Sequence, residues 1–214
     1  MTRANLDFYY EFASPYSYLS ACRIGPLAEA AGVNVNWRPF LLGPIFAAQG
    51  YTSSPFNVFP IKGEHMWRDM ERLAARAGLP PVTKPDPFPV NALLAARVAT
   101  WLNDASRPAF SIAVFRAEFA QGRDIADRTV VRQVLGGLGH FCDSVIEEAE
   151  GQANKDRLRA TTDAARAAGL FGAPSFVTAD GELFWGNDRL EHALEHARDH
   201  AAGRHPAAQA ARGA

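Results

Sequence analysis

The sequence has few cysteines, no long apolar run and no surplus of charge of either sign. Its two cysteines, Cys22 and Cys142, form neither a CxxC pair nor a zinc or disulfide pattern. Lys and Arg number 22 against 23 Asp and Glu, so nucleic acid is not expected as the main partner. Every apolar stretch is interrupted before about 18 residues, and residues 1–7 lack the core of a secretory signal. We therefore expect a cytoplasmic protein that does not enter a membrane.

The amino-acid composition is that of an ordinary globular protein. Of its 214 residues, 48% are hydrophobic and 21% are charged. That length suits one large domain or one domain with an insertion. The Ala-, Gly- and Arg-rich tail 201–214 has little to bury, and we expect it to be disordered.

The N-terminal segment has the pattern of a β-α-β unit. The aromatic-rich stretch Leu6–Phe12 predicts a buried strand, and Val33–Phe40 alternates apolar and polar residues like a second one. Between them, Ser14 at the N-cap, Pro15 at the first helical position and Gly32 as a stop delimit a helix. The short crossover predicts that the two strands are parallel.

The middle of the chain is expected to be helical. Residues 41–60, rich in Gly, Pro, Ser and aromatics, lack periodicity and predict a long loop. Apolar periodicity then predicts about five helices. They cover residues 64–77, 91–103, 108–121, 127–138 and 143–168.

The C-terminal part returns to strands. Ala173–Val177 and Leu183–Trp185 flank the turn signal Asp180-Gly181 and predict a hairpin. A last helix opens at residues 186–188, and its inner face carries Leu190, Ala193, Leu194 and Ala197. The order βαβ, helices, ββα predicts an α/β fold with one four-stranded mixed sheet. Residues 1–62 and 169–200 form the sheet domain, and residues 63–168 form a helical insertion.

The segment Ser14-Pro15-Tyr16-Ser17 is the strongest chemical signal. It lies at the carboxyl end of a predicted strand, where ligands bind in parallel-sheet units. The N–H groups and dipole of the following helix favour an anion or a thiolate there. Thioredoxin-like enzymes carry Cys-x-x-Cys at this location, whereas both positions here are serine. A dithiol oxidoreductase is therefore excluded at this site.

Together these features resemble the DsbA-like thioredoxin superfamily. The closer similarity is to the 2-hydroxychromene-2-carboxylate isomerases and the related kappa-class glutathione transferases. The matching stretches, in order over residues 5–198, are 7–9, 14–19, 38–43, 67–72, 87–91, 171–176 and 184–190. The resemblance implies a DsbA-like thioredoxin fold, a homodimer, and a glutathione-dependent cis–trans isomerase of aromatic-degradation pathways.

The same resemblance implies which residues bind glutathione. Ser14 matches the catalytic serine, whose hydroxyl holds the glutathione sulfur as a thiolate. Ala173-Pro174 matches the cis-proline turn, whose free backbone pairs with the cysteinyl unit of glutathione. In the last turn, Asn187 or Asp188 receives the γ-glutamyl ammonium. The implied glutathione-binding set is Ser14, Ala173, Pro174, Trp185, Gly186, Asn187 and Asp188.

For the substrate, the resemblance implies a small aromatic or conjugated oxoacid. Its pocket residues match Asn57, Lys62, Phe88 and Asn91, and a lysine ammonium suits a substrate carboxylate. The sequence departs from the family at Ala47 and Tyr51, where a lysine and an asparagine are usual. The physiological substrate is therefore open.

Two rival functions and one rival site follow from the same residues. A kappa-type transferase would use the same thiolate for net conjugation. A redox-dead thioredoxin-like binding or chaperone protein would instead bind peptides along the Ala173 edge. His192, His196 and His200 recur every fourth residue, but they lie off the apolar stripe of their helix. They indicate a solvated face, and we predict no metal site.

Overall fold

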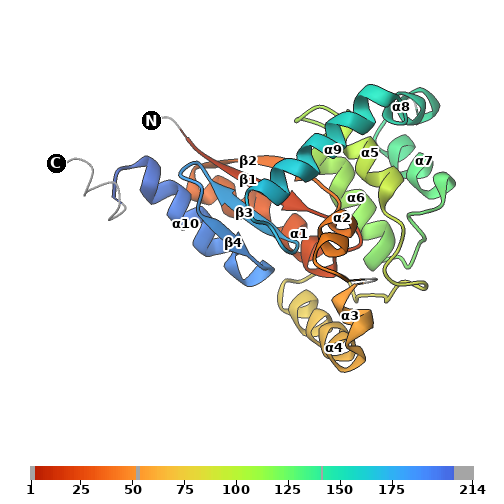
Figure 1. Cartoon of the computed structure of the whole chain (residues 1–214), viewed down its shortest axis with the longest axis horizontal. Coiled ribbons are helices and arrows are strands. Elements are labelled where there is room, and N and C mark those ends of the chain that lie inside the picture. The colour runs from red at the N-terminus through yellow and green to blue at the C-terminus, as the bar shows by residue number, and fades with distance from the viewer. Residues whose placement is uncertain (1–2, 52–53, 141, 205–214) are drawn as a thin grey trace.

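A four-stranded mixed sheet forms the centre of the molecule (Figure 1). The computed structural model describes residues 3–51, 54–140 and 142–204. The strands are β1 (Ala4–Tyr10), β2 (Val33–Pro39), β3 (Ser175–Thr178) and β4 (Leu183–Trp185). Their order is β2-β1-β3-β4, with β1 parallel to β2 and antiparallel to β3. The predicted mixed sheet is confirmed.

Helices fill the sequence between β2 and β3 and surround the sheet. Before the insertion, α1 (Pro15–Ala31) joins β1 to β2. After β4, a short 3₁₀ turn, η1 (Asn187–Arg189), leads into α10 (Leu190–Ala201), the last helix of the described residues. The remaining helices are α2 (Leu42–Ala48), α3 (Pro55–Val58), α4 (Pro60–Arg76), α5 (Leu93–Trp101), α6 (Arg107–Phe119), α7 (Arg128–Gly137), α8 (Cys142–Ala149) and α9 (Gln152–Ala167).

The predicted bounds of α1 are confirmed by its caps. The Ser14 side chain accepts a hydrogen bond from the Ser17 N–H, and Pro15 occupies the first helical position. Gly32 ends the helix in the left-handed conformation, with φ 68°, and its N–H bonds the carbonyls of Ala28 and Glu29. A residue with a side chain rarely adopts that backbone conformation, so glycine makes this stop sharp.

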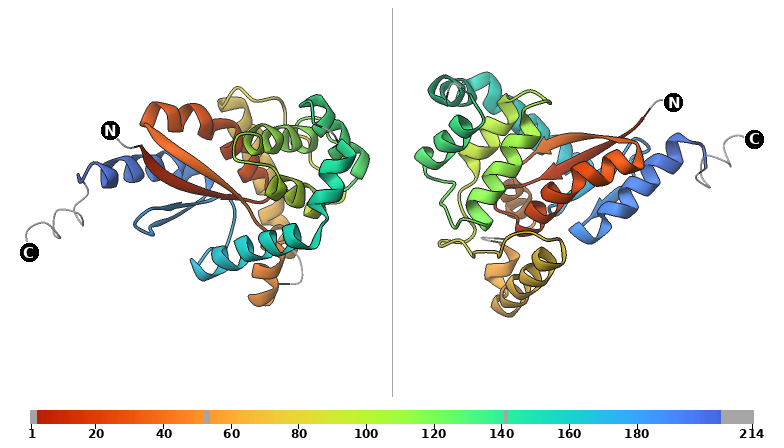
Figure 2. Two further views of the ribbon diagram at one scale, coloured as in Figure 1. Left: turned by 90° about the horizontal axis from the view of Figure 1, so that it is seen from above. Right: turned by 180° about the vertical axis from the view of Figure 1, so that it is seen from behind.

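The two faces of the sheet bury different clusters because side chains alternate along β1. Leu6, Phe8 and Tyr10 point into the main core, which α1 and α10 cover. Tyr9 lies on the other face, in a second cluster with residues of α2 and α9. Figure 2 shows α1 and α9 on opposite sides of the sheet. That second cluster consists of Tyr9, Phe40, Ile45, Ala165 and Leu170. The predicted inner face of α10 is confirmed, because all four of its residues are buried in the main core.

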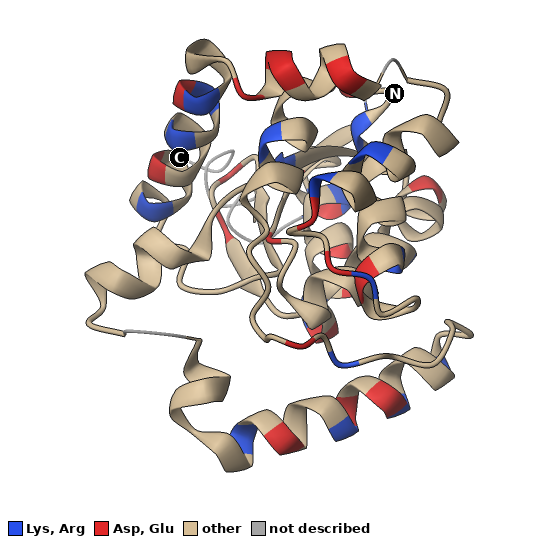
Figure 3. Ribbon diagram, turned by 90° about the vertical axis from the view of Figure 1, so that its right-hand side faces the viewer, with Lys and Arg blue, Asp and Glu red and all other residues tan. Residues whose placement is uncertain are grey.

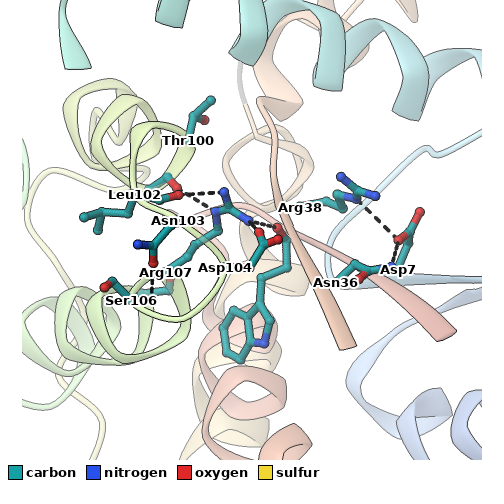
Figure 4. Close-up of polar contacts among 12 residues, drawn as sticks. Asp7, Asn36, Arg38, Thr100, Leu102, Asn103, Asp104, Ser106 and Arg107 are labelled. Carbon is teal, nitrogen blue, oxygen red and sulfur yellow. Dashed lines mark hydrogen bonds and ion pairs between the residues drawn. The ribbon is translucent and has the colours of Figure 1, made fainter. Parts of the chain in front are cut away.

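Arg107 joins the helical insertion to the sheet (Figure 4). Its guanidinium donates to the backbone carbonyls of Trp37 in β2 at 3.3 Å and of Leu102 at 2.7 Å, and it pairs with Asp104. Because its side chain is mostly buried, Arg107 satisfies carbonyls at the end of α5 that would otherwise lack donors. One apolar cluster runs from the sheet through the insertion helices. The division at residues 62 and 168 stays a prediction.

Two predictions about the middle of the chain are wrong. Residues 41–60 are not one long loop, because α2 and α3 lie within them. Ile45 anchors α2 in the second cluster, and Ser54 caps α3 by accepting from the Phe56 N–H. The helix predicted over 143–168 is two helices, α8 and α9. Asn154 donates to the carbonyl of Ala149 at 2.8 Å, which closes the end of α8.

The ends of several elements also differ from the prediction. The first strand begins at Ala4 and ends at Tyr10, two residues earlier than expected, because residues 11–13 already turn toward α1. The third strand begins at Ser175, after the proline. Of the tail expected to be disordered, α10 includes Ala201, and residues 205–214 lie outside the described residues.

Charges are mixed over the described surface. Figure 3 shows acidic and basic residues interspersed along α4 rather than grouped in runs of one sign. Within the described ranges, no helix is long and apolar enough to cross a membrane. The same ranges contain no group of three or more His, Cys, Asp or Glu residues arranged to hold a metal ion.

The expectation of a solvated histidine face is wrong for two of its three members. His192 is exposed, but the His196 ring bonds Asp180 at 2.8 Å and packs against Phe184. His200 lies 3.3 Å from the same carboxylate. The β3–β4 turn brings Asp180 back over α10, a contact that helix periodicity alone does not predict.

We expect Asp180→Asn to lower the free energy of unfolding by about 1 kcal/mol at pH 7, since water partly screens the pairing. Burial raises the pKa of Asp180, but hydrogen bonds from Thr178 and His196 outweigh this effect and lower the pKa from 3.8 to about 2. A lowered folded-state pKa stabilises the protein above pH 4, and that stability is lost as the pH falls toward 2.

Urea unfolding of the wild type and of Asp180→Asn at several pH values measures the difference in their free energies of unfolding. This difference should be full at neutral pH and shrink below about pH 4. The control is Asp163→Asn, which removes an exposed pair with Arg166 at 3.5 Å and should change stability by less than about 0.5 kcal/mol. A difference of equal size at every pH would contradict the assignment to this carboxylate.

Candidate active site

The serine motif lies where β1 passes into α1. Ser14 is 8% exposed, and its hydroxyl oxygen accepts from the Ser17 N–H at 3.2 Å. The same hydroxyl donates to the carbonyl of Ala173 at 3.0 Å, across 159 residues of sequence. The proton of Ser14 is therefore directed at the turn before β3. A ligand that donates a hydrogen bond to the Ala173 carbonyl in place of Ser14 leaves the Ser14 hydroxyl free to donate to another acceptor.

The Ala173-Pro174 turn faces Ser14 and leads to the last turn of the sheet. Its peptide bond is cis, as the resemblance implied. The Pro174 carbonyl accepts from the Gly186 N–H at 3.0 Å. Two hydrogen bonds thus connect Ser14, the cis-proline turn and Gly186. These residues lie together at one edge of the sheet, beside the start of α1.

Trp185 forms an exposed aromatic wall at this edge. It is 52% exposed, and its indole lies 4.9 Å from the ring of Phe171. The indole is also packed over Gly172, where an added Cβ would lie 2.3 Å from the indole nitrogen. A side chain at position 172 would displace the indole from its present place, and the ring is open to a ligand on its exposed side.

Asn187 and Asp188 play different parts in the turn that follows. Asn187 is buried, and its side-chain oxygen accepts from Ser20 at 3.1 Å and from Arg23 at 2.9 Å. It ties η1 to α1. The Asp188 carboxylate is exposed and lies 3.1 Å from Arg189. Of the two, Asp188 is the one accessible to a ligand ammonium.

Two cavities lie along α3 and α4, and the larger of them reaches the start of α1. The larger, of about 430 Å³, is lined by Tyr16, Phe56, Ile61, Lys62, His65 and Met66. The smaller, of about 280 Å³, is lined by Phe56, Asn57, Pro60, Gly63, Glu64, Trp67, Lys84 and Phe88. Phe56 belongs to both, so it forms a shared wall. The larger cavity includes Tyr16, one residue from Pro15 in the serine motif.

The four predicted substrate residues do not share one pocket. Asn57 and Phe88 line the smaller cavity, and the Asn57 amide donates to the Phe88 carbonyl at 2.9 Å. Lys62 lines the larger one, with its ammonium 4.7 Å from the centre of the Phe59 ring. Asn91 lines neither; its side-chain oxygen accepts from the Leu93 N–H at 3.1 Å, at the start of α5.

Tyr16 lines the site but was not among the predicted site residues. Its hydroxyl donates to the Asp69 carboxylate in α4 at 2.9 Å. Burial, then the hydrogen bond and negative charge of Asp69, raise the pKa of Tyr16, so it remains a neutral phenol. The signal for Tyr16 was its place inside the serine motif. Nothing local indicates Asp69, which lies 53 residues away.

The fold and the site define a thioredoxin-type domain whose cysteines are replaced by serines. The family described as DSBA-like thioredoxin domain matches residues 5–197. A 2-hydroxychromene-2-carboxylate isomerase from Sphingobium xenophagum is 32% identical over 87% of this chain and 94% of its own length. The chain belongs to the DsbA-like thioredoxin family and, within it, to the enzymes related to 2-hydroxychromene-2-carboxylate isomerase.

Two further comparisons agree with this family. The solved structure of a 2-hydroxychromene-2-carboxylate isomerase superposes with a TM-score of 0.82 at 26% identity, covering 92% of this chain and 98% of the other. Glutathione S-transferase kappa 1 from Homo sapiens is 25% identical over 87% of each chain. The relatives thus include isomerases and a transferase.

Proposed function

We propose that the chain is a glutathione-dependent cis–trans isomerase that acts on an aromatic or conjugated oxoacid. The observation that carries the proposal is the Ser14 hydroxyl, set at the N-terminus of α1 and hydrogen-bonded to Ala173. The kappa transferase is named for its use of glutathione, and the isomerases share the fold. A diffusible thiol would supply the sulfur that this motif lacks.

Glutathione binding would rearrange one hydrogen bond. The cysteinyl N–H of the tripeptide pairs with the Ala173 carbonyl, as a strand edge does, and so displaces the Ser14 hydroxyl. The released hydroxyl then donates to the sulfur, and the dipole of α1 favours the thiolate over the thiol. The exposed Asp188 carboxylate takes the γ-glutamyl ammonium, and the indole of Trp185 flanks the peptide.

The larger cavity suits the second reactant. Phe56, Ile61 and Met66 provide apolar walls for a conjugated ring system. Lys62 provides a cation for its carboxylate, and Tyr16, from the serine motif, lines the same cavity with its hydroxyl bonded to Asp69. The smaller cavity, with Asn57 and Phe88, extends the site beyond Phe56. Asn91 would act through the start of α5 rather than by touching the substrate.

The chemistry is addition followed by elimination. The thiolate forms a C–S bond at the conjugated carbon, and the electron pair of the double bond moves to the carbonyl oxygen as an enolate. The former double bond is now single and rotates. The enolate then collapses, the C–S bond breaks, and the thiolate leaves with its electron pair. The chain's contribution is to align the two reactants and stabilise both anions.

Calorimetry with glutathione and S-methylglutathione tests the proposal. We expect glutathione to bind at sub-millimolar concentration, and the methylated form about tenfold more weakly, because it cannot become a thiolate. No binding at about 1 mM would contradict the proposal and favour the redox-dead peptide-binding protein instead.

Product analysis separates the isomerase from the kappa-type transferase that the human relative suggests. An isomerase returns glutathione unchanged at the end of the reaction, whereas a stable conjugate would identify a transferase.

A cytoplasmic location fits this chemistry, because Cys22 and Cys142 are free thiols and glutathione must be reduced. The homodimer stays a prediction.

A further inference from the structure

The two halves of α4 have different surroundings. Met70 and Ala74, in its second half, are buried in the main core. Figure 1 shows α4 apart from helices α5–α9, and it packs against α1 and α3. Its first half supplies most of the residues that line the larger cavity, namely Ile61, Lys62, His65 and Met66. The position of this cavity wall therefore depends on what holds α4 against α1.

A hydrogen bond between Tyr16 and Asp69 joins these two helices. Tyr16 is the second residue of α1, directly after Pro15, and its hydroxyl donates to the Asp69 carboxylate at 2.9 Å. Both residues are half-buried. On α4, Asp69 lies one turn after His65 and Met66, at spacings that share a helix face. The hydrogen bond is therefore made beside the cavity wall.

The chemistry of the two partners favours a strong hydrogen bond. A carboxylate only accepts, so the phenol supplies the proton, and such a bond is stronger than one between neutral groups. Burial, then the hydrogen bond and charge of Asp69 and the charge of Asp188, raise the pKa of Tyr16, so the proton stays on the phenol. Two carboxylates, one from η1 and one from α4, thus act on the same phenol.

We propose that Asp69 is a positioning residue, which holds the Tyr16 hydroxyl and so fixes the cavity-lining half of α4 at the first turn of α1. Ser14 caps that same turn. The hydrogen bond therefore sets where the cavity wall, including Lys62, lies relative to the Ser14 hydroxyl. A small misplacement of one reactant lowers a rate strongly. The effect on the reaction rests on the proposed function, whereas the connection between α1 and α4 does not.

Amide hydrogen exchange without any ligand tests the connection between the helices. Tyr16→Phe removes the hydroxyl and keeps the ring, and it should speed exchange of amides 64–68 in α4 about tenfold. Asp69→Ala should do the same, and Tyr16→Phe decides the matter alone if that variant does not fold. Exchange in α5, the internal reference, should stay within about twofold of the wild type. Unchanged exchange at residues 64–68, or an equal rise in α5, would overturn the proposal.

A double-mutant cycle on kcat/KM for the proposed oxoacid measures the effect on the reaction. Each single variant should lower kcat/KM about tenfold, and the double variant no further, because both changes remove the same hydrogen bond. Glutathione affinity should stay within about twofold of the wild type, whereas a merely structural role would weaken it as well. Losses that multiply in the double variant would overturn the positioning role.

The matched control is Glu71→Ala, which removes an exposed carboxylate of the same helix that pairs with Arg68. It should leave the exchange rates of α4 and kcat/KM unchanged, and a loss as large as that of Asp69→Ala would overturn the proposal. A wild-type protein that fails to bind glutathione would contradict the proposed function alone, because the exchange rates would still decide the role of Asp69.

Discussion

Ser14→Ala is expected to lower the rate of glutathione-dependent turnover about 100-fold while weakening glutathione binding by no more than about tenfold. In the proposed function, the hydroxyl acts on one atom of the tripeptide, the sulfur, whose charge must be stabilised for the reaction to proceed. The backbone of Ala173 and the carboxylate of Asp188 would remain to hold the rest of glutathione. Steady-state kinetics and calorimetry on the same preparations separate the two effects.

The variant also loses the N-cap of α1, which costs about 1 kcal/mol of stability. Asp127→Ala is the matched control, because Asp127 caps α7 by accepting from the Thr129 N–H, on a helix that lines neither cavity. It should lose similar stability and keep full turnover. Equal losses of turnover and glutathione affinity in Ser14→Ala, or no loss at all, would count against a sulfur-binding hydroxyl.

The parts of the fold that were predicted correctly depend on neighbours in sequence. A serine cap, a proline at the first helical position and a glycine stop specify α1 within one stretch of chain. The buried stripe of α10 follows from helical periodicity in the same way. Ser14 stood out because it lies at the carboxyl end of a parallel strand, and strand and helix were both recognisable locally.

The parts that were missed depend on contacts between distant segments. α2 is fixed by Ile45, which packs against Tyr9 on the far face of the sheet. The Asn187 side chain faces α1 because it accepts hydrogen bonds from Ser20 and Arg23, which lie more than 160 residues earlier. Periodicity cannot reveal such partners. The resemblance named candidate site residues, but it did not indicate whether each faces a cavity or another helix.

Gly63→Ala is expected to raise the KM for the proposed oxoacid substrate at least about tenfold and to lower the free energy of unfolding by about 1–3 kcal/mol. A Cβ at this position in α4 would lie 2.5 Å from the backbone carbonyl oxygen of Phe56. A backbone atom cannot rotate away as a side chain can, so α3 must move. Phe56 is the wall shared by both cavities, and their shapes change with it.

Glutathione affinity, measured by calorimetry, should stay within about twofold of the wild type, because the hydrogen bonds at the Ser14 edge come from α1, the cis-proline turn and Gly186. The matched control is Gly137→Ala in α7, where an added Cβ meets nothing within 4 Å. That change should stabilise the protein by up to about 1 kcal/mol, because alanine favours the helix, and leave KM unchanged. An unaltered KM in Gly63→Ala would place substrate binding away from the α3–α4 cavities.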